Sequence, residues 1–257
     1  MQNNFVTDAI NLKSYNLSES DKIIVMYSKD KGLIRGVAKG VKKPKSKLGA
    51  RMDLLVANTL MLHKGKNLDT ICQAEVLNTF HKTRQDIDKI MYSMYVTEVV
   101  HNFGLEEDPS SETIYNLLYK TLNAISTSQS KVEILLCVIK FQLKMMIESG
   151  FSIELDSCLH CHNKIGNETM FFVPQIGGVV CSCCAEKIHY SKKQMPYKLR
   201  DFFKQMSIND FDEKGEYELK ANEKVCTVTF EALKEYIALK SPKKFKSTDI
   251  LQEMPAV

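Results

Sequence analysis

Long apolar runs are missing from this sequence of 257 residues, because none reaches the roughly 18–20 residues that a membrane-spanning helix requires. The densest apolar stretch, residues 132–141, is interrupted by Lys140. The N-terminus also lacks a basic start followed by an apolar stretch, which is the pattern of a secretory signal. We therefore expect a cytoplasmic protein with no membrane partner and with one or two domains, each large enough to bury a core.

Sequence motifs that mark enzymes are missing as well. There is no GxxxxGKS or GxxxxGKT loop for a nucleotide phosphate, no GxGxxG, no GxSxG and no HExxH. The carboxylates are scattered along the chain, so no cluster is expected to hold the paired magnesium ions of a nuclease. We predict that the protein is not an enzyme.

Negative charge is scarce in the first third of the chain. Residues 1–82 contain 14 Lys and Arg against 7 Asp and Glu, a net charge of +7. The remainder contains 21 basic and 24 acidic residues, a net charge of −3. This asymmetry indicates that the first third of the protein contacts a polyanion.

Much of this excess lies in residues 31–51, KGLIRGVAKGVKKPKSKLGAR, which contain no acidic residue. The glycines and Pro44 indicate a loop between strands, and such a loop can lie along a phosphate backbone and release its counterions. A solvated surface loop is the alternative. We predict that the basic residues of this segment bind nucleic acid: Lys31, Arg35, Lys39, Lys42, Lys43, Lys45, Lys47 and Arg51.

Short apolar segments separated by polar residues predict strands over residues 5–76. Lys29–Gly32 and His63–Asn67 are typical of tight turns, because Asp, Asn and Gly tolerate the backbone angles that turns require. Strands are predicted over Met52–Leu62 and Leu68–Glu75. About five short strands in about 75 residues favour a small closed barrel, with an open antiparallel sheet as the alternative.

After His81 the apolar residues recur at the three- and four-residue spacings of helices. The pattern predicts helices at about 87–103, 111–122, 131–149, 195–206 and 225–239, and a loose tail at 247–257. The third helix is apolar nearly all round, so it should be the buried centre of a bundle. The fold class is therefore α+β, with a barrel at residues 1–80 and a helical domain at 81–257.

Eight cysteines are present, but disulfides are not expected, because there is no export signal and the cytosol keeps thiols reduced. Four of them form two C-x-x-C pairs that a hairpin around Gly177 and Gly178 would bring together. Two such pairs supply the four soft ligands of a tetrahedral zinc site, and four protein ligands leave no position for a reactive water. We predict one structural zinc ion in an insert at about 156–190, held by Cys158, Cys161, Cys181 and Cys184.

Other ligand sets remain open. Cys183 could replace one cysteine of the second pair, although only Cys181 with Cys184 repeats the spacing of the first pair. His160 and His162 could also replace a cysteine ligand, and a redox-active C-x-x-C pair is a further alternative. The other cysteines lie in apolar patterns and are predicted to pack in the core: Cys72, Cys137 and Cys226.

The order of these features resembles the bacterial RecO family of DNA repair proteins. The resemblance covers essentially the whole chain and rests on DKGLIRGVAKGVKKPKSK, on LKMMIESGF and on the two cysteine pairs. It implies an N-terminal OB-fold followed by an α-helical domain that carries a zinc knuckle. It also implies a recombination mediator that binds single- and double-stranded DNA and anneals complementary strands. Such a protein acts with RecR, and with RecF, to load RecA onto strands coated by single-strand-binding protein.

The resemblance also implies where partners bind. It places DNA contacts on the barrel, first on Lys31, Arg35, Lys39, Lys42 and Lys43, and then on Lys45, Lys47 and Arg51. It places the tail of single-strand-binding protein on the helical domain, where we consider the cluster of Lys192, Lys193, Lys198 and Arg200. The rival interpretations are a zinc-containing adaptor for protein partners and an RNA-binding protein without annealing activity.

Overall fold

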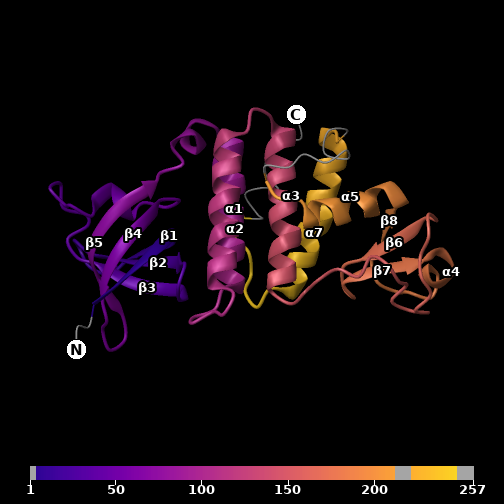
Figure 1. The fold of residues 1–257 in the computed structure, drawn as a ribbon, viewed down its shortest axis with the longest axis horizontal. Coiled ribbons are helices and arrows are strands. Elements are labelled where there is room, and N and C mark those ends of the chain that lie inside the picture. The colour runs from indigo at the N-terminus through magenta and orange to yellow at the C-terminus, as the bar shows by residue number, and fades with distance from the viewer. Residues whose placement is uncertain (1–3, 212–220, 248–257) are drawn as a thin grey trace. The chain divides into compact units, whose positions relative to one another are not determined.

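The computed structural model describes residues 4–211 and 221–247 (Figure 1). These residues form two compact units. Unit 1 comprises residues 4–127 with 245–247, and unit 2 comprises residues 128–211 with 221–244. The change from strands to helices along the chain is therefore not the place where the units divide. Except for Ser247, the predicted tail lies outside the described residues.

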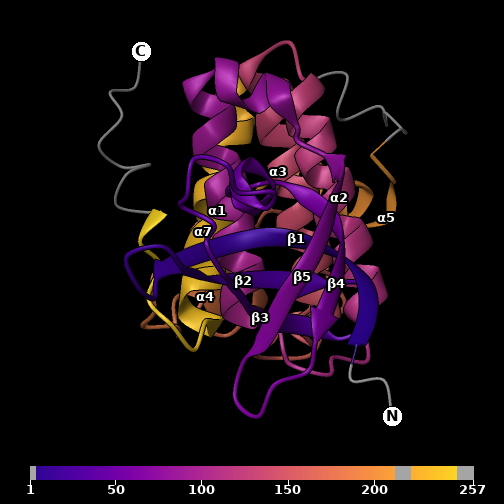
Figure 2. The same ribbon diagram turned by 90° about the vertical axis from the view of Figure 1, so that its left-hand side faces the viewer.

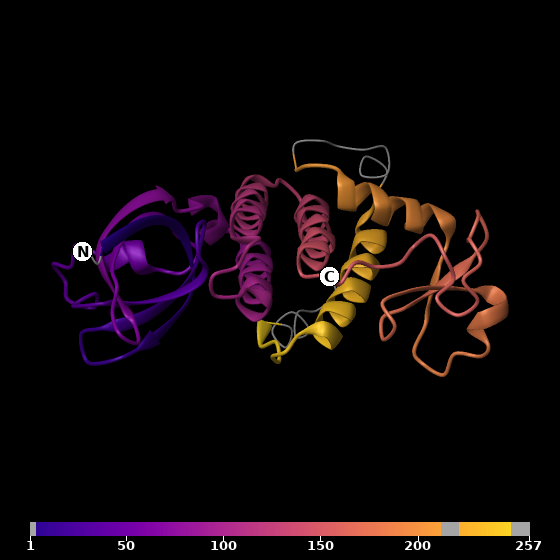
Figure 3. The same ribbon diagram turned by 60° about the horizontal axis from the view of Figure 1, so that its bottom comes forward.

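Five strands of unit 1 form a closed barrel in the order β1-β2-β3-β5-β4 (Figures 2 and 3). Neighbouring strands are antiparallel except β3 and β5, which are parallel. A five-stranded barrel is the architecture of the OB-fold, so the prediction of a barrel is confirmed against the open sheet. The strands are β1 (Asn4–Asn16), β2 (Lys22–Ser28), β3 (Gly32–Ala38), β4 (Ala57–His63) and β5 (Asp69–Asn78).

The long strand β1 closes the barrel because its two halves pair with different neighbours. Residues Asn4–Ile10 pair with β4, and residues Ala9–Asn16 pair with β2. A register shift between Asn11 and Lys13 bends the strand between the two pairings. Inward-facing apolar side chains such as Ile24 fill the interior, and each fully buried one stabilises the fold by roughly 1.5–3 kcal/mol.

The strand predicted over Met52–Leu62 is wrong at its start, which belongs to the connection between β3 and β4. The chain first forms the 3-10 helix η1 (Gly49–Met52), and β4 begins only at Ala57. The buried amides of Asn11 and Asn58 donate to the carbonyl of Arg51 at 2.8 and 2.9 Å. Polar side chains from the barrel therefore fix this segment, and the apolar sequence pattern could not reveal them.

Three helical segments follow the barrel in unit 1: η2 (His81–Gln85), α1 (Ile87–Phe103) and α2 (Ser111–Thr127). The side chain of Asp86 caps α1 by accepting from the backbone N–H of Lys89 at 3.1 Å. Gly104 ends α1 as predicted, and its φ of −62° is an ordinary one. A side chain at Gly104 is excluded by packing, because a Cβ there would lie 2.8 Å from the ring of Tyr27.

The described C-terminal residues return to α1. The ring of Phe245 packs against Tyr95, with ring centroids 6.1 Å apart. The carboxylate of Glu98 accepts the backbone N–H groups of Lys246 and Ser247 at 2.9 and 2.8 Å. Unit 1 is thus completed by a segment that follows unit 2 in the sequence.

Unit 2 is built on α3 (Lys131–Glu148), which packs with α5 (Tyr197–Ile208) and α7 (Glu223–Lys240). Ten residues of α3 are buried, which confirms the prediction of a buried helix. The helix predicted from Met195 begins two residues later, because Met195 precedes Pro196 and the residue before a proline disfavours helical angles. No described helix is long and apolar enough to cross a membrane.

A small sheet of unit 2 carries the predicted hairpin. Its strand order is β7-β6-β8, from β6 (Met170–Val173), β7 (Gly178–Cys181) and β8 (Lys193–Met195). Gly177 has a φ of +77° in the turn between β6 and β7, a conformation that favours glycine. The short helix α4 (Ser182–Ala185) follows β7 directly. The hairpin therefore leads straight into the second cysteine pair.

Candidate metal centre and nucleic-acid interface

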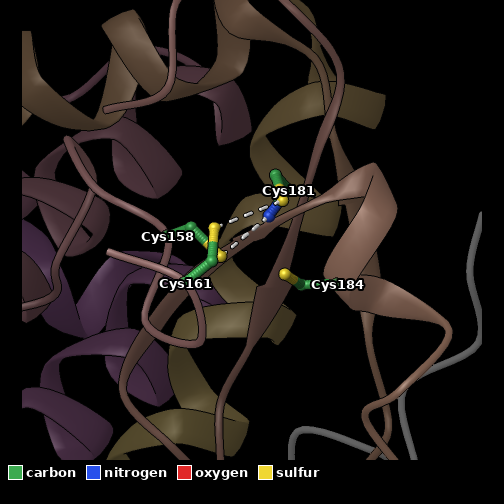
Figure 4. A group of neighbouring side chains, drawn as sticks. All are labelled: Cys158, Cys161, Cys181 and Cys184. Carbon is green, nitrogen blue, oxygen red and sulfur yellow. Dashed lines mark hydrogen bonds between the residues drawn. The ribbon is translucent and has the colours of Figure 1, made fainter. Parts of the chain in front are cut away.

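The sulfur atoms of four cysteines in unit 2 turn toward one another (Figure 4). The Sγ atoms of Cys158, Cys161, Cys181 and Cys184 all lie within 4.8 Å of one another, and those of Cys161 and Cys181 are 3.9 Å apart. Four thiolates at about 2.3 Å from a tetrahedral zinc ion would lie roughly 3.8 Å from one another. Both the spacing and the donor set therefore fit one tetrahedral metal ion.

Backbone contacts hold the two cysteine pairs together. The N–H of Leu159 donates to the carbonyl of Val179 at 3.0 Å, which ties the first pair to β7. The N–H of His162 donates to the carbonyl of Cys158 at 2.8 Å, and His162 takes a left-handed φ of 61°. This tight turn places both thiols of the first pair on one side, while the end of β7 and the start of α4 present the second pair.

The thiols of the cluster differ in acidity. Burial disfavours a charge on Cys158, but the backbone N–H groups of Cys161, Cys181 and His160 stabilise its thiolate more strongly and lower its pKa to about 6. The neighbouring Cys181 thiol, together with burial, raises the pKa of Cys184 to about 12. Burial also raises the pKa of Cys181. Without a metal the cluster thus favours one thiolate, and a bound dication would stabilise the others.

The alternative ligands lie outside this cluster. Cys183 is exposed, and so are His160 and His162. Within residues 4–211 and 221–247, the four cysteines are the only group of three or more His, Cys, Asp or Glu residues that could hold a metal ion.

The remaining cysteines only partly follow the prediction of core packing. Cys226 is fully buried and Cys137 is half-buried. The prediction for Cys72 is wrong, because Cys72 is exposed. Adjacent residues of a strand point to opposite faces, and on β5 it is Ile71 that enters the barrel core.

Six of the eight predicted DNA-binding residues lie on the loop between β3 and β4, here called the β3–β4 loop (residues 39–56), and all six are exposed: Lys39, Lys42, Lys43, Lys45, Lys47 and Arg51. The start of the loop is anchored on the β1–β2 connection. The N–H of Gly40 donates to the Asp21 carboxylate at 2.7 Å, and this bond lowers the pKa of Asp21. The ammonium group of Lys42 donates to the carbonyl of Ser18 at 3.0 Å.

The other two predicted residues belong to a different part of β3. Lys31 precedes the strand and Arg35 lies within it, and the seven strand residues between Lys31 and Lys39 separate the two lysines by roughly 25 Å. Both cations have acidic partners, because Lys31 Nζ lies 3.3 Å from Glu107 Oε1 and an Arg35 nitrogen lies 3.8 Å from Glu106 Oε1. The eight residues therefore do not form one uniform cationic surface.

A groove on the barrel brings in two lysines that the sequence analysis did not assign. Lys64 and Lys66 lie on the loop between β4 and β5 and are exposed. They line a groove with Lys31 and Arg35, and the half-buried ring of Phe5 lies in the same groove, 5.3 Å from the Lys31 ammonium group. In OB-folds this loop borders the ligand-binding face, so the strand order is the signal that could have identified the two lysines.

The basic cluster considered for the tail of single-strand-binding protein is not a single exposed surface. Arg200 is buried, and its guanidinium donates to the carbonyls of Ile165 and Gly166 at 2.9 and 2.7 Å. Lys193 forms an ion pair with Glu235 at 2.6 Å. The prediction is therefore wrong for Arg200, which instead binds the backbone of the segment that follows the first cysteine pair.

Comparison with known proteins gives the same result for both parts of the chain. The family model "Recombination protein O N terminal" matches residues 1–80, and "Recombination protein O C terminal" matches residues 84–249. A relative in Desulforamulus reducens, "DNA repair protein RecO", is 29% identical over 247 residues, which cover 96% of this chain and 93% of the relative. A protein of the same name in Dehalococcoides mccartyi is 33% identical over 181 residues, 70% of each chain. Another in Rubrobacter xylanophilus is 31% identical over 173 residues, which cover 67% of this chain and 68% of the relative.

Proposed function

Because the chain belongs to the RecO family of DNA repair proteins, we propose that it is a recombination mediator that binds single- and double-stranded DNA and anneals complementary strands. With RecR, and with RecF, it helps to load RecA onto strands coated by single-strand-binding protein. It acts in the cytoplasm and makes or breaks no covalent bond, so it is not an enzyme. The family itself supports the coarser role in DNA repair and recombination.

The exposed cationic β3–β4 loop on a closed OB-type barrel is the observation that carries this proposal. Six basic side chains extend from a loop whose start is anchored on Asp21 and Ser18. Cations on such a loop neutralise phosphates whatever the base sequence, and each contact releases counterions. Lys64 and Lys66 extend the proposed DNA contacts to the groove at the other end of β3.

Annealing follows from charge neutralisation alone. Two complementary strands repel each other through their phosphates, and a protein that binds both backbones lowers this repulsion while leaving the base edges available for pairing. Phosphate contacts position a strand without reading its sequence. The proposal therefore requires exposed cations on a folded barrel, and unit 1 has both.

The zinc ion of this proposal is structural. Cys158, Cys161, Cys181 and Cys184 would hold it, and it would stabilise the fold of unit 2. The convergent sulfur atoms and the backbone N–H groups that stabilise the Cys158 thiolate support this assignment. Four cysteine ligands leave no coordination position for a substrate.

The test is a strand-annealing assay. Two complementary labelled oligonucleotides, one of them coated with the cognate single-strand-binding protein, are mixed with the purified protein without ATP. We expect faster annealing, and the acceleration should decrease as salt increases because counterion release drives the binding. Folded, zinc-loaded protein that does not accelerate annealing would instead favour an adaptor for protein partners. Preferential binding to a matched RNA strand would favour an RNA-binding protein.

A further inference from the structure

Three acidic residues line the cationic groove of the barrel, and one of them, Asp69, accepts the backbone N–H of Gly65 at 3.1 Å. The connection between α1 and α2 carries Glu106 and Glu107, and both line the groove together with Lys31 and Arg35. Glu107 pairs with Lys31 at 3.3 Å, and Glu106 pairs with Arg35 at 3.8 Å. Two cations that we expect to contact DNA thus have resident anionic partners.

The backbone fixes the acidic segment against β3. The N–H of Leu33 donates to the carbonyl of Leu105 at 2.8 Å, and the N–H of Glu107 donates to the carbonyl of Lys31 at 2.8 Å. Gly32 permits this close approach, because its φ is +67° and a Cβ there would lie only 2.3 Å from the Leu105 carbonyl oxygen. These backbone bonds therefore fix Glu106 and Glu107 beside the groove.

The next residue anchors the same segment in the core. Asp108 is 8% exposed, and its carboxylate accepts the hydroxyl group of the fully buried Tyr27 at 3.0 Å. Its other carboxylate oxygen accepts the backbone N–H of Ser110 at 2.9 Å. Asp108 thus holds the segment in place, while the side chains of Glu106 and Glu107 remain exposed and can rotate away from the cations.

We propose that Glu106 and Glu107 are built-in competitors for phosphate at the Lys31–Arg35 end of the groove. Carboxylate and phosphate bind the same donors of arginine and lysine. Exposed ion pairs are weak, so a polyanionic strand can displace them, and they form again when the strand leaves. This inference rests on the proposed DNA binding and extends it, because it assigns low affinity and fast release to one end of the interface.

The other side of the groove is open. In the described part of the chain, no ion pair engages Lys64 or Lys66, and both are exposed. A strand would therefore first contact the β4–β5 loop and then displace the two glutamates from β3. For annealing, the returning carboxylates would promote release of the finished duplex.

The test is the double variant Glu106→Gln with Glu107→Gln, which keeps the shape and the backbone contacts. Its matched control is Glu112→Gln with Glu168→Gln, which changes the net charge equally outside the groove; Glu112 pairs with Lys29 at 3.2 Å. Binding to a fluorescent oligothymidylate is measured by anisotropy over a series of salt concentrations. We expect the groove variant alone to bind about three- to tenfold more tightly at low salt. The salt slope, which is the slope of the logarithm of the binding constant against the logarithm of the salt concentration, should steepen by up to about 0.7 for each cation released to the strand.

The same two glutamate substitutions are then tested in a protein without the paired cations, to show whether the tighter binding depends on Lys31 and Arg35. When Lys31→Gln and Arg35→Gln are also present, removing the two glutamates should give no tightening. Tightening that persists there, or equal tightening in the control, would overturn the inference. So would a groove variant that binds like the wild-type protein while the wild type shows salt-sensitive binding. A wild-type protein with no salt-sensitive binding would instead contradict the proposed function, and the inference with it.

Discussion

Among single residues, the adjacent cysteines Cys183 and Cys184 offer the sharpest test of the metal centre. Cys184 is buried in the four-sulfur cluster, whereas Cys183 is exposed and outside it. Cys184→Ser should therefore lose zinc and lower the temperature of unfolding, because metal binding contributes directly to folding. Cys183→Ser should keep both. Zinc content by atomic absorption and thermal denaturation measure the difference, and a wild-type protein without zinc would contradict the assignment.

The unequal acidities of the cluster predict how zinc affinity depends on pH. Zinc binds thiolates, and at about pH 7 Cys158 is already ionised, whereas the raised pKa values of Cys181 and Cys184 keep those two thiols protonated. Zinc binding should thus release at least two protons at this pH, and its affinity should rise with pH. Calorimetry in buffers of different ionisation enthalpy measures the released protons. Zinc binding that releases no protons would contradict the raised pKa values of Cys181 and Cys184.

Without metal, the lowered pKa of Cys158 makes the stability of the folded state depend on pH in a direction that can be predicted. The thiolate is favoured in the folded protein relative to the unfolded chain, whose thiol has a pKa near the ordinary 9.0. This contribution is fully present above about pH 9 and is lost as the pH falls toward about 6. The metal-free protein should therefore lose stability over this range, which urea unfolding at several pH values would show.

Gly32 tests the close approach of β3 and the α1–α2 connection. Alanine at this position would have to adopt a φ of +67° and place its Cβ 2.3 Å from a carbonyl oxygen. Gly32→Ala should lower the free energy of unfolding by about 2 kcal/mol or more. Gly49→Ala is the control, because nothing lies within 4 Å of a Cβ there. Urea unfolding compares the two variants, and equal stabilities would contradict the predicted clash.

The residues that the sequence predicted best are those whose chemistry depends on local spacing. The four cysteines of the cluster were predicted as one set because each C-x-x-C turn orients its own two thiols, and the structure brings all four together. Lys64 and Lys66 were not assigned from the sequence, because their turn joins Lys31 and Arg35 in one groove only when β3 and β5 pair. Cys72 was predicted on the wrong face because Ile71 and Cys72 are both apolar in sequence, and only the barrel decides which one points inward.

For whole elements, the β3–β4 loop should control DNA affinity without affecting the fold. Lys43→Ala with Lys45→Ala, which leaves the Lys42 anchor in place, should weaken binding to all sequences and reduce the salt slope by about 0.7 for each lost contact with a single strand. Lys164→Ala with Lys224→Ala, exposed lysines of unit 2, is the control with equal charge change. Anisotropy titrations over a range of salt measure both slopes. An unchanged slope in the loop variant would contradict the assigned contacts.

Elements were predicted well where one repeating pattern determines them. The apolar spacing of α3 required a buried helix, and ten of its residues are buried. Boundaries were less predictable, because they depend on contacts distant in sequence. The amides of Asn11 and Asn58 fix the segment before β4, and pairing of Met195 with Met170 adds β8 before α5.

In the molecule as a whole, metal removal should affect the two units differently. The cysteine cluster belongs to unit 2, whereas the barrel and its cations belong to unit 1. Chelation of zinc should increase amide hydrogen exchange around Cys158–Cys184 and leave the barrel strands protected. Salt-sensitive DNA binding should persist in the chelated protein. Loss of protection in the barrel strands would contradict this independence.

The order of strands and helices along the chain was predictable, but the packing of α1 and α2 with the barrel was not. Periodicity changes near residue 81, where the strands end and the helices begin. Yet α1 and α2 belong with the barrel, partly because the segment between them bonds to β3 and to Tyr27. Such long-range hydrogen bonds leave no periodic signal in a sequence.

The return of residues 245–247 to α1 has a consequence for how the protein is made. A ribosome releases the chain from its N-terminus onward, so the barrel with α1 and α2 emerges first. All of unit 2 must be synthesised before Phe245 can pack against Tyr95 and before Glu98 can accept the N–H groups of Lys246 and Ser247. The nascent unit 1 therefore waits while the 117 residues of 128–244 are synthesised, with this part of its α1 surface uncovered.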